Sequence, residues 1–476
     1  MIALTPLLMA LIFILAAPLV ARAPEARSAR QIGTSFVTAA LALAVLLTAA
    51  DDLTSAPRAL VHGLALIHGL VLSLSPGGAL HLMPIVAGMV GLLALSMSPA
   101  ETHPPRTLAR TLQLLAIASA CLATSRPALL VALWAASSAI AWAELRDRAT
   151  IDRTGRGHRS DRAERPDRLF AAYHLPSAAL VAIGVALISA GSRTTGATLL
   201  VLGFAIRGAV IPAHSWFPLF VERAPMGLVV AFAIPQLGIY AQLTQLTQSP
   251  QGLPGQLAHF IPVIGAVSAL CAAALGIVQE DARRALAYLM MSQTAMVTFG
   301  LASPSPVARS GALLAFQVLS LSLSGFAMTL TALEARRGAL SLRTPGGSFA
   351  RTPRLAVAFL VLGLATVGFP LSAGFAAEDL LVQGAVEAHP LLDVCVLAAS
   401  ALNGIAVMRA FFMLFAGRRP QVGEQDLTRR EAYALTVAMA ALLGFGVLPR
   451  ALIATDAGDS GVREESGAPA SAHHGG

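Results

Sequence analysis

An arginine beside a helix break is the first feature of this sequence that could do chemistry. Arg207 lies within an apolar stretch that breaks at Pro212, and the chain passes through His214 before apolar sequence resumes. A charged side chain and a broken helix are both costly in lipid, so this feature should face a protein interior or a water-filled cavity. It favours the binding or passage of an ion or a proton. His214 is either a proton relay or a packing residue of the turn.

A second broken stretch carries two adjacent carboxylates. Glu378 and Asp379 follow the sequence Gly-Phe-Pro at residues 368–370. A carboxylate can gain and lose a proton, whereas an arginine stays protonated at any biological pH. Glu378 is therefore either the titrating group of an ion path or a structural carboxylate that pairs with an arginine or with exposed backbone.

The composition predicts the surroundings of these residues. The chain has 476 residues, of which 56% are hydrophobic and 12% are charged, and its mean hydropathy is +0.71. Many apolar runs reach or approach the roughly 20 residues that span a bilayer. A soluble protein would carry about twice this fraction of charged residues. We expect an all-α polytopic membrane protein with about 14 transmembrane helices.

The distribution of charge predicts the topology. All 33 basic residues are arginine, the net charge is +8, and the arginines concentrate in connections between helices. By the positive-inside rule these connections are cytoplasmic, which puts both termini outside a bacterial inner membrane and argues against binding to nucleic acid. The apolar run Ile2 to Val20 is expected to be a retained first helix, because no basic residue precedes it. No cofactor or metal motif is present, and the three cysteines are isolated.

The two breaks predict the organisation of the helices. They fall in predicted helices 7 and 12, and paired broken helices in corresponding halves indicate an inverted-repeat transporter. We expect helices 4–8 and 9–13 to form two five-helix repeats. The predicted segments are residues 1–106 for three helices with an external hairpin, 107–250 and 251–416 for the repeats, 417–450 for the last helix, and 451–476 for a disordered tail.

Three stretches, in register, resemble one family of membrane proteins. Residues 207–240, with Pro-Ala-His-Ser-Trp-Phe-Pro at 212–218, are similar to P-x-H-x-W-L-P-D-A…A-P-T. Residues 281–293 resemble D-x-K-R-L-L-A-Y-S-S-x-S-H/Q, and residues 368–379 resemble G-x-P-x-x-x-G-F-x-x-K/E. The family comprises the antiporter-like membrane subunits of respiratory complex I, and it is shared with Mrp-type cation/proton antiporters, membrane-bound hydrogenases and inorganic-carbon uptake complexes.

The resemblance implies a row of buried lysines, histidines and glutamates along which protons move. Arg207 stands at the helix-7 lysine position, Gln236 at the helix-8 lysine position, and Gln293 where many relatives have histidine. Glu378 matches the terminal Lys/Glu site. The proton or ion path that the sequence predicts consists of Arg207, His214, Gln236, Gln293, Glu378 and Asp379.

Several family positions have lost their titratable groups. The helix-5 glutamate falls at Ala135, after Trp134, and no residue titrates in the stretch 316–322, where helix 11 should carry a histidine and a lysine. Glu144 lies nine residues after Ala135 and is expected to be an interfacial charge at the cytoplasmic end. The chain thus resembles a degenerate member of the family.

Three functions remain open from the sequence. The first is a membrane subunit of a complex-I-like assembly, such as an NADH-quinone oxidoreductase, that takes part in proton or cation translocation while other subunits carry any redox chemistry. The second is a non-conducting structural or docking subunit. The third is the membrane partner of an inorganic-carbon uptake complex. The expected partners are the lipid bilayer, other membrane subunits and, in some of these assemblies, a soluble redox or zinc protein.

Overall fold

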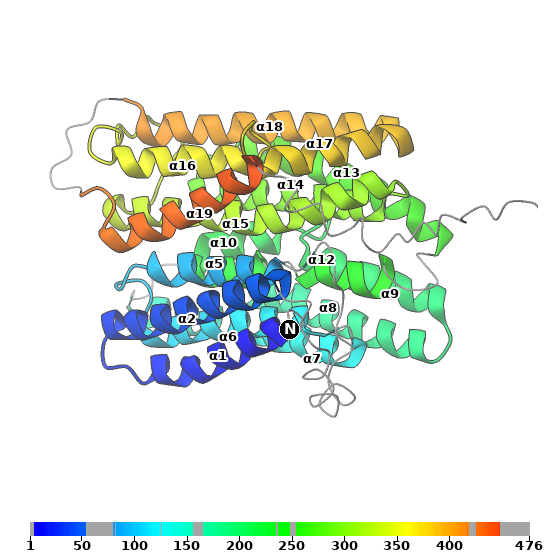
Figure 1. Ribbon diagram of the computed structural model, residues 1–476, viewed down its shortest axis with the longest axis horizontal. Helices are drawn as coiled ribbons and strands as arrows, with labels where there is room; N and C mark the ends of the chain where they lie inside the picture. The colour runs from blue at the N-terminus through cyan, green and yellow to red at the C-terminus, as the bar shows by residue number, and fades with distance from the viewer. Residues whose placement is uncertain are drawn as a thin grey trace, which may run out of the picture.

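The computed structural model describes residues 4–53, 80, 82–124, 126–155, 165–234, 237–247, 254–417 and 425–447. Every named element in these ranges is a helix, and nine of the helices are long and apolar enough to cross a membrane. Figure 1 shows an elongated bundle in which N-terminal helices lie along one side and C-terminal helices along the other. The prediction of an all-α multi-pass membrane protein is confirmed. The count of fourteen spans and the limits of the two repeats stay predictions, and the hairpin and tail lie almost wholly outside the described residues.

The helices in chain order are α1 Thr5–Ala21, α2 Ala26–Leu53, α5 Met83–Ser96, α6 Pro105–Leu122, α7 Pro127–Gly155, α8 Pro166–Ser189, α9 Arg193–Arg207, α10 Trp216–Arg223, α11 Met226–Ala233, α12 Leu237–Gln242, the π-helix η2 Leu243–Thr247, α13 Gly255–Ile277, α14 Ala282–Ala302, α15 Pro306–Arg337, α16 Pro353–Ala365, α17 Ala373–Ala388, α18 Pro390–Phe415 and α19 Arg429–Val447.

Sequence signals at the helix starts explain several of these boundaries. Proline occupies the first turn of α1, α5, α6, α8, α15, α16 and α18, where its missing N–H is not needed. The Asp281 side chain caps α14 by accepting a hydrogen bond from the backbone N–H of Arg284 at 2.9 Å. This cap fixes the start of α14, a helix that lines the site described below.

The first break lies earlier than the sequence indicates. Arg207 was expected in the middle of a helix that breaks at Pro212, but it is the last residue of α9. Gly208 follows it, and Ala209 takes a positive φ of 52°, which an α-helix cannot accommodate. The indole N–H of Trp216, at the start of α10, donates to the Ile206 carbonyl at 2.9 Å and holds the two halves together.

The second break falls where the sequence places it. The chain leaves α16 at Ala365 and enters α17 at Ala373. Between them Gly368 and Leu371 have φ values of 68° and 74°. Glycine tolerates this left-handed conformation, whereas leucine is strained there. Both breaks thus contain a non-glycine residue with positive φ.

Glycines let α8 and α9 pack backbone to backbone. A Cβ at Gly196 would lie 2.7 Å from the Gly184 carbonyl oxygen and 2.9 Å from the backbone nitrogen of Ile188. Both atoms belong to a helix backbone and cannot move aside cheaply. The close approach of these helices fixes α9, and therefore the position of Arg207 at its end.

One end of the bundle carries a set of ion pairs, which we call the arginine layer. Most of its pairs join α6 to α7, α10 to α14, α14 to α15 or α15 to α19. One pair lies within α7, and one joins the loops before α14 and after α15. They are Arg110–Glu144, Arg110–Asp147, Arg148–Glu144, Arg284–Glu222, Arg283–Glu334, Arg336–Glu431 and Arg343–Glu280. The turn between α1 and α2 and the start of α19 lie at this same end, on the left of Figure 1.

We predict that Gly196→Ala lowers the stability of the protein by about 1–3 kcal/mol, because its methyl group would press on the backbone of α8. The matched control is Gly404→Ala in α18, where a Cβ meets no atom within 4 Å. There the substitution should be neutral or stabilising by up to about 1 kcal/mol, since alanine favours the helix. Thermal unfolding of the purified variants in detergent measures both effects, and equal Tm values would contradict the packing argument.

Candidate functional site

Aromatic rings and a hydroxyl surround the buried cation. Arg207 is 7% exposed, and its Nη1 donates to Ser138 Oγ of α7 at 3.1 Å. The guanidinium carbon lies 4.9 Å from the ring centre of Trp134 and 4.1 Å from that of Phe232. Among the described residues Nη2 has no hydrogen-bond partner, and Arg207 forms no ion pair. Cation–π contacts and one hydrogen bond replace a carboxylate here.

A hydrogen-bonded chain leads from Arg207 to a histidine. Ser138 Oγ lies 3.1 Å from Nδ1 of His174 in α8. Because Ser138 accepts from Arg207, its own proton is available to Nδ1, which assigns the imidazole proton to Nε2. The His174 ring stacks on Phe170 with centroids 3.9 Å apart and meets the edge of Trp216 at 4.4 Å. His174 is therefore held rigidly beside the cation.

A second set of hydrogen bonds positions the aromatic wall. The Trp134 indole N–H donates to Ser177 Oγ at 3.2 Å, and Ser177 donates to the Gly203 carbonyl at 2.8 Å. These bonds tie α7 to α8 and α8 to α9 within one turn of Arg207. The orientation of the ring over the guanidinium is thus set by backbone as well as by packing.

A cavity adjoins the guanidinium. The cavity has a volume of about 60 Å³ and is bounded by α9 to α14. Since one water needs about 10–15 Å³ by this measure, the cavity has room for about four. Its wall is apolar apart from Arg207, Gln242, Thr294 and Thr298. We call it the arginine cavity.

Glu378 lines a second cavity, which we call the glutamate cavity. This cavity has a volume of about 20 Å³, which is enough for about one water. Gln293 of α14 and Gly368 of the second break also line it. A Cβ at Gly368 would overlap the carboxylate, so glycine makes the room for it. In the part of the chain that the structure describes, Glu378 pairs with no arginine.

One helix separates the two cavities. Thr294 and Thr298 of α14 line the arginine cavity, whereas Gln293 and Val297 line the glutamate cavity. The side chain of Gln242, the last residue of α12, donates to the Thr298 carbonyl at 3.3 Å and so joins α12 to α14. α14 is therefore the wall that the two cavities share.

Comparison with known proteins places part of the chain in a family. Residues 174–403 match the transmembrane family model described as NADH:quinone oxidoreductase/Mrp antiporter. Residues 174–403 belong to that family. The chain is 28% identical over 258 residues to F(420)H(2) dehydrogenase subunit M of Methanosarcina mazei, covering 52% of this chain and 51% of the relative. It is 29% identical over 251 residues to NADH-quinone oxidoreductase subunit 13 of Thermus thermophilus, covering 52% and 53%.

The fold of this chain matches solved structures over nearly its whole length. A chain of respiratory complex I from Thermus thermophilus with bound NADH superposes with a TM-score of 0.76 at 20% identity, covering 95% of this chain and 96% of that chain. A chain of the Mrp complex from Dietzia sp. gives 0.75 at 16% identity, with 95% of each covered. In sequence alignment, by contrast, the chain spans about half the length of the curated relatives that it matches.

Three of the six predicted site residues line the two cavities. Arg207 lines one cavity, and Gln293 and Glu378 share the other. His214 lies in the loop after α9, where its Nδ1 is 3.2 Å from the Pro212 carbonyl oxygen. It lines neither cavity.

Asp379 points away from its neighbour's cavity. It is exposed and accepts a hydrogen bond from Gln383 at 2.8 Å. Gln236 lies outside the described residues. Within the described ranges no group of three or more His, Cys, Asp or Glu side chains is placed to hold a metal ion. A role for any of the six residues in an ion path stays a prediction.

Sequence reasoning did not select two residues that contact the arginine. Ser138 faces Arg207 where the resemblance places the lost glutamate at Ala135, and Ala135 itself lies on the exposed side of α7. His174 follows apolar sequence and stands two residues before Pro176 inside α8. A lone polar residue beside a proline in an apolar helix is the signal that marks it.

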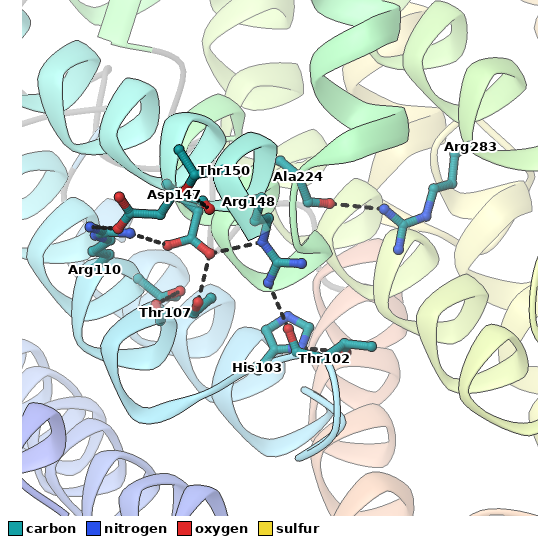
Figure 2. A network of polar contacts seen from close by, with 11 residues as sticks. Thr102, His103, Thr107, Arg110, Asp147, Arg148, Thr150, Ala224 and Arg283 are labelled. Carbon is teal, nitrogen blue, oxygen red and sulfur yellow. Dashed lines mark hydrogen bonds and ion pairs between the residues drawn. The ribbon is translucent and has the colours of Figure 1, made fainter. Parts of the chain in front are cut away.

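Glu144, which the sequence indicates to be an interfacial charge, is buried within the protein. It is 2% exposed and accepts hydrogen bonds from Thr107 at 2.6 Å, Arg110 at 2.6 Å and Arg148 at 2.9 Å. Figure 2 labels these three donors. Arg148 also donates to the Thr102 carbonyl at 2.7 Å. Three donors, two of them charged, compensate the buried carboxylate, so it serves the arginine layer and stands apart from Arg207.

A buried histidine lies at the edge of this network. His103, in the loop before α6, is 1% exposed, and its Nδ1 is 2.9 Å from the Thr102 hydroxyl. Burial, together with the Arg148 and Arg283 cations, lowers the pKa of His103 to about 3. The ring is therefore neutral at physiological pH, and folding opposes its protonation.

We predict that His103 makes the protein acid-sensitive. Its pKa in the folded state lies below the ordinary 6.5, so between pH 6.5 and 3 the unfolded state binds more protons. Stability should fall with decreasing pH in that window, by as much as about 1.4 kcal/mol per pH unit from this residue. The His103→Gln variant should lose this part of the pH dependence in thermal unfolding between pH 7 and 4. The control His214→Gln should keep it, and identical profiles for the two variants would refute the assignment.

Proposed function

We propose that this antiporter-like chain is a membrane subunit of a multisubunit, complex-I-like assembly in a bacterial inner membrane, with both termini outside. We propose further that it takes part in proton or cation translocation. The observation that supports translocation is the position of Glu378, a carboxylate that lines an internal cavity one helix away from the cavity of Arg207.

The residues take different parts in this proposal. Glu378 gains and loses the proton, and the water that its cavity can hold delivers it. Arg207 is a fixed positive charge, which raises the energy of any second cation in the adjacent cavity. The route across α14 therefore uses neutral groups, namely Gln293 and the hydroxyl groups of Thr294 and Thr298, with water between them.

His174 lies beside Arg207 and lines neither cavity. Its Nδ1 is linked to the guanidinium through Ser138, and its Nε2 has no partner among the described residues. Because the fixed charge of Arg207 opposes a second cation at this distance, the imidazole stays neutral. His174 therefore positions Ser138 and Arg207 and does not carry a proton.

A non-conducting docking subunit is the second candidate. The observation in its favour is the environment of Arg207, which forms no ion pair with a described residue and cannot titrate. In that case the buried charge stabilises the break, and the arginine layer serves contact with other subunits.

We predict that Glu378→Gln lowers proton flux in proteoliposomes of the intact assembly by about tenfold or more, because the amide cannot exchange a proton. The matched control is Asp379→Asn, which removes the neighbouring carboxylate outside the cavity and should leave the flux unchanged. Flux that survives Glu378→Gln would sink the translocation proposal, and a wild-type assembly without flux would favour the docking subunit.

We predict that the full chain co-purifies with other membrane subunits in mild detergent, because its structural relatives include chains of complex I and of Mrp. Mass spectrometry of the co-purifying chains distinguishes the assemblies. A co-purifying dehydrogenase or hydrogenase subunit indicates a complex-I-like enzyme. A co-purifying soluble zinc protein indicates inorganic-carbon uptake. A chain that purifies alone from its native membrane would contradict membership in an assembly.

A further inference from the structure

The charge of Arg207 is not balanced by any side chain in the described structure. An arginine cannot shed its proton in a protein, so neutralisation by deprotonation is closed to it. Burying a cation costs several kcal/mol unless a counter-charge or a full set of hydrogen bonds compensates it. Arg207 has one hydrogen bond and two aromatic contacts, and Nη2 retains its donors.

The arginine cavity supplies space next to this unbalanced charge. Arg207 lines the cavity together with Gln242, Thr294 and Thr298, and none of the residues that line it is acidic. Its volume of about 60 Å³ is several times what one water needs. A metal cation would meet a permanent positive charge there and no carboxylate ligand, so cations are disfavoured.

We propose that the arginine cavity binds one small monovalent anion, of the chloride or bicarbonate class, as the counter-ion of Arg207. The anion lies in this cavity beside the guanidinium of Arg207, which lines it. One negative charge balances one buried positive charge, whereas a divalent anion would leave a net charge in an apolar wall. The proposal concerns only Arg207 and does not depend on proton translocation.

The rest of the wall completes the site through water. The Thr294 hydroxyl donates to the Met290 carbonyl at 2.8 Å, and the Thr298 hydroxyl donates to the Thr294 carbonyl at 3.0 Å. Their oxygens therefore present lone pairs, which accept from the hydration water of an anion and not from the anion itself. The anion sits against Arg207 with its water toward α14. It supplies the negative charge that the resemblance assigns to a glutamate of helix 5.

Thermal unfolding in controlled anions tests the proposal. The purified full chain is exchanged into detergent buffer whose only anion is gluconate, and chloride or bicarbonate then replaces gluconate at constant ionic strength. We expect a saturable rise in Tm of several degrees, and the anion that saturates at the lower concentration is the physiological class. A wild-type Tm that does not respond to either anion overturns the proposal.

Variants locate the effect. Arg207→Met should abolish the rise, whereas Arg409→Met should keep it, because Arg409 donates to the Gln279 carbonyl and lines neither cavity. An equal rise in both variants overturns the proposal.

A second pair of variants applies if Arg207→Met does not fold. Ser138→Asp places a fixed carboxylate on Arg207 and should abolish the anion response, while Ser138→Ala should retain it. A Ser138→Asp protein that still responds like the wild type overturns the proposal. If Ser138 and Arg207 had only a structural role, neither substitution would change how Tm responds to anions.

Discussion

A guanidinium held inside an apolar bundle is the constraint on which the central part of this structure depends. Its burial costs several kcal/mol. Each aromatic face offsets about 0.5–2 kcal/mol of this, a hydrogen bond to a charged group about 1.5–3, and the carbonyl end of a helix about 0.3–1. These terms together approach the cost only because Trp134, Phe232, Ser138 and the end of α9 converge on one side chain. The break is part of this arrangement, since it ends α9 at Arg207 itself.

The two breaks use the same backbone device for opposite charges. Each leaves the helical conformation through a residue of positive φ, Ala209 in the first and Leu371 in the second. The cation stands at a helix C-terminus, where the dipole of the helix favours it. Glu378 stands in the second turn of α17, where the dipole effect has largely decayed, and its carboxylate occupies the room beside Gly368.

The fold class followed from the sequence because it rests on quantities that a sequence displays directly. Apolar run lengths, prolines and arginine-rich connections indicated a polytopic helical protein with two broken helices, and three motifs in register identified the family. The break itself was placed several residues too late, because the φ of Ala209 depends on packing and not on Pro212. The environment of the arginine was also hidden. Whether Ser138 and His174 face Arg207 depends on how α7 and α8 rotate against α9.

Glu144 shows the same limit for charged residues. Hydropathy treats a glutamate near a helix end as an exposed charge, yet here the loop containing Thr102 and the start of α6 fold over it and supply its donors. Burial of a charge is decided by long-range partners, and Arg110 lies 34 residues away in the chain. Local composition carries no record of such a pairing.

The placement of α14 has a mechanical consequence. Gln293 and Thr294 are neighbours in the chain but face different cavities, because successive residues point about 100° apart around a helix. The same helix is pinned on its far side by Asn403, which donates to Ser292 at 2.8 Å. The arginine cavity and the glutamate cavity therefore share α14 as a common wall, so the position of this one helix sets the size of both.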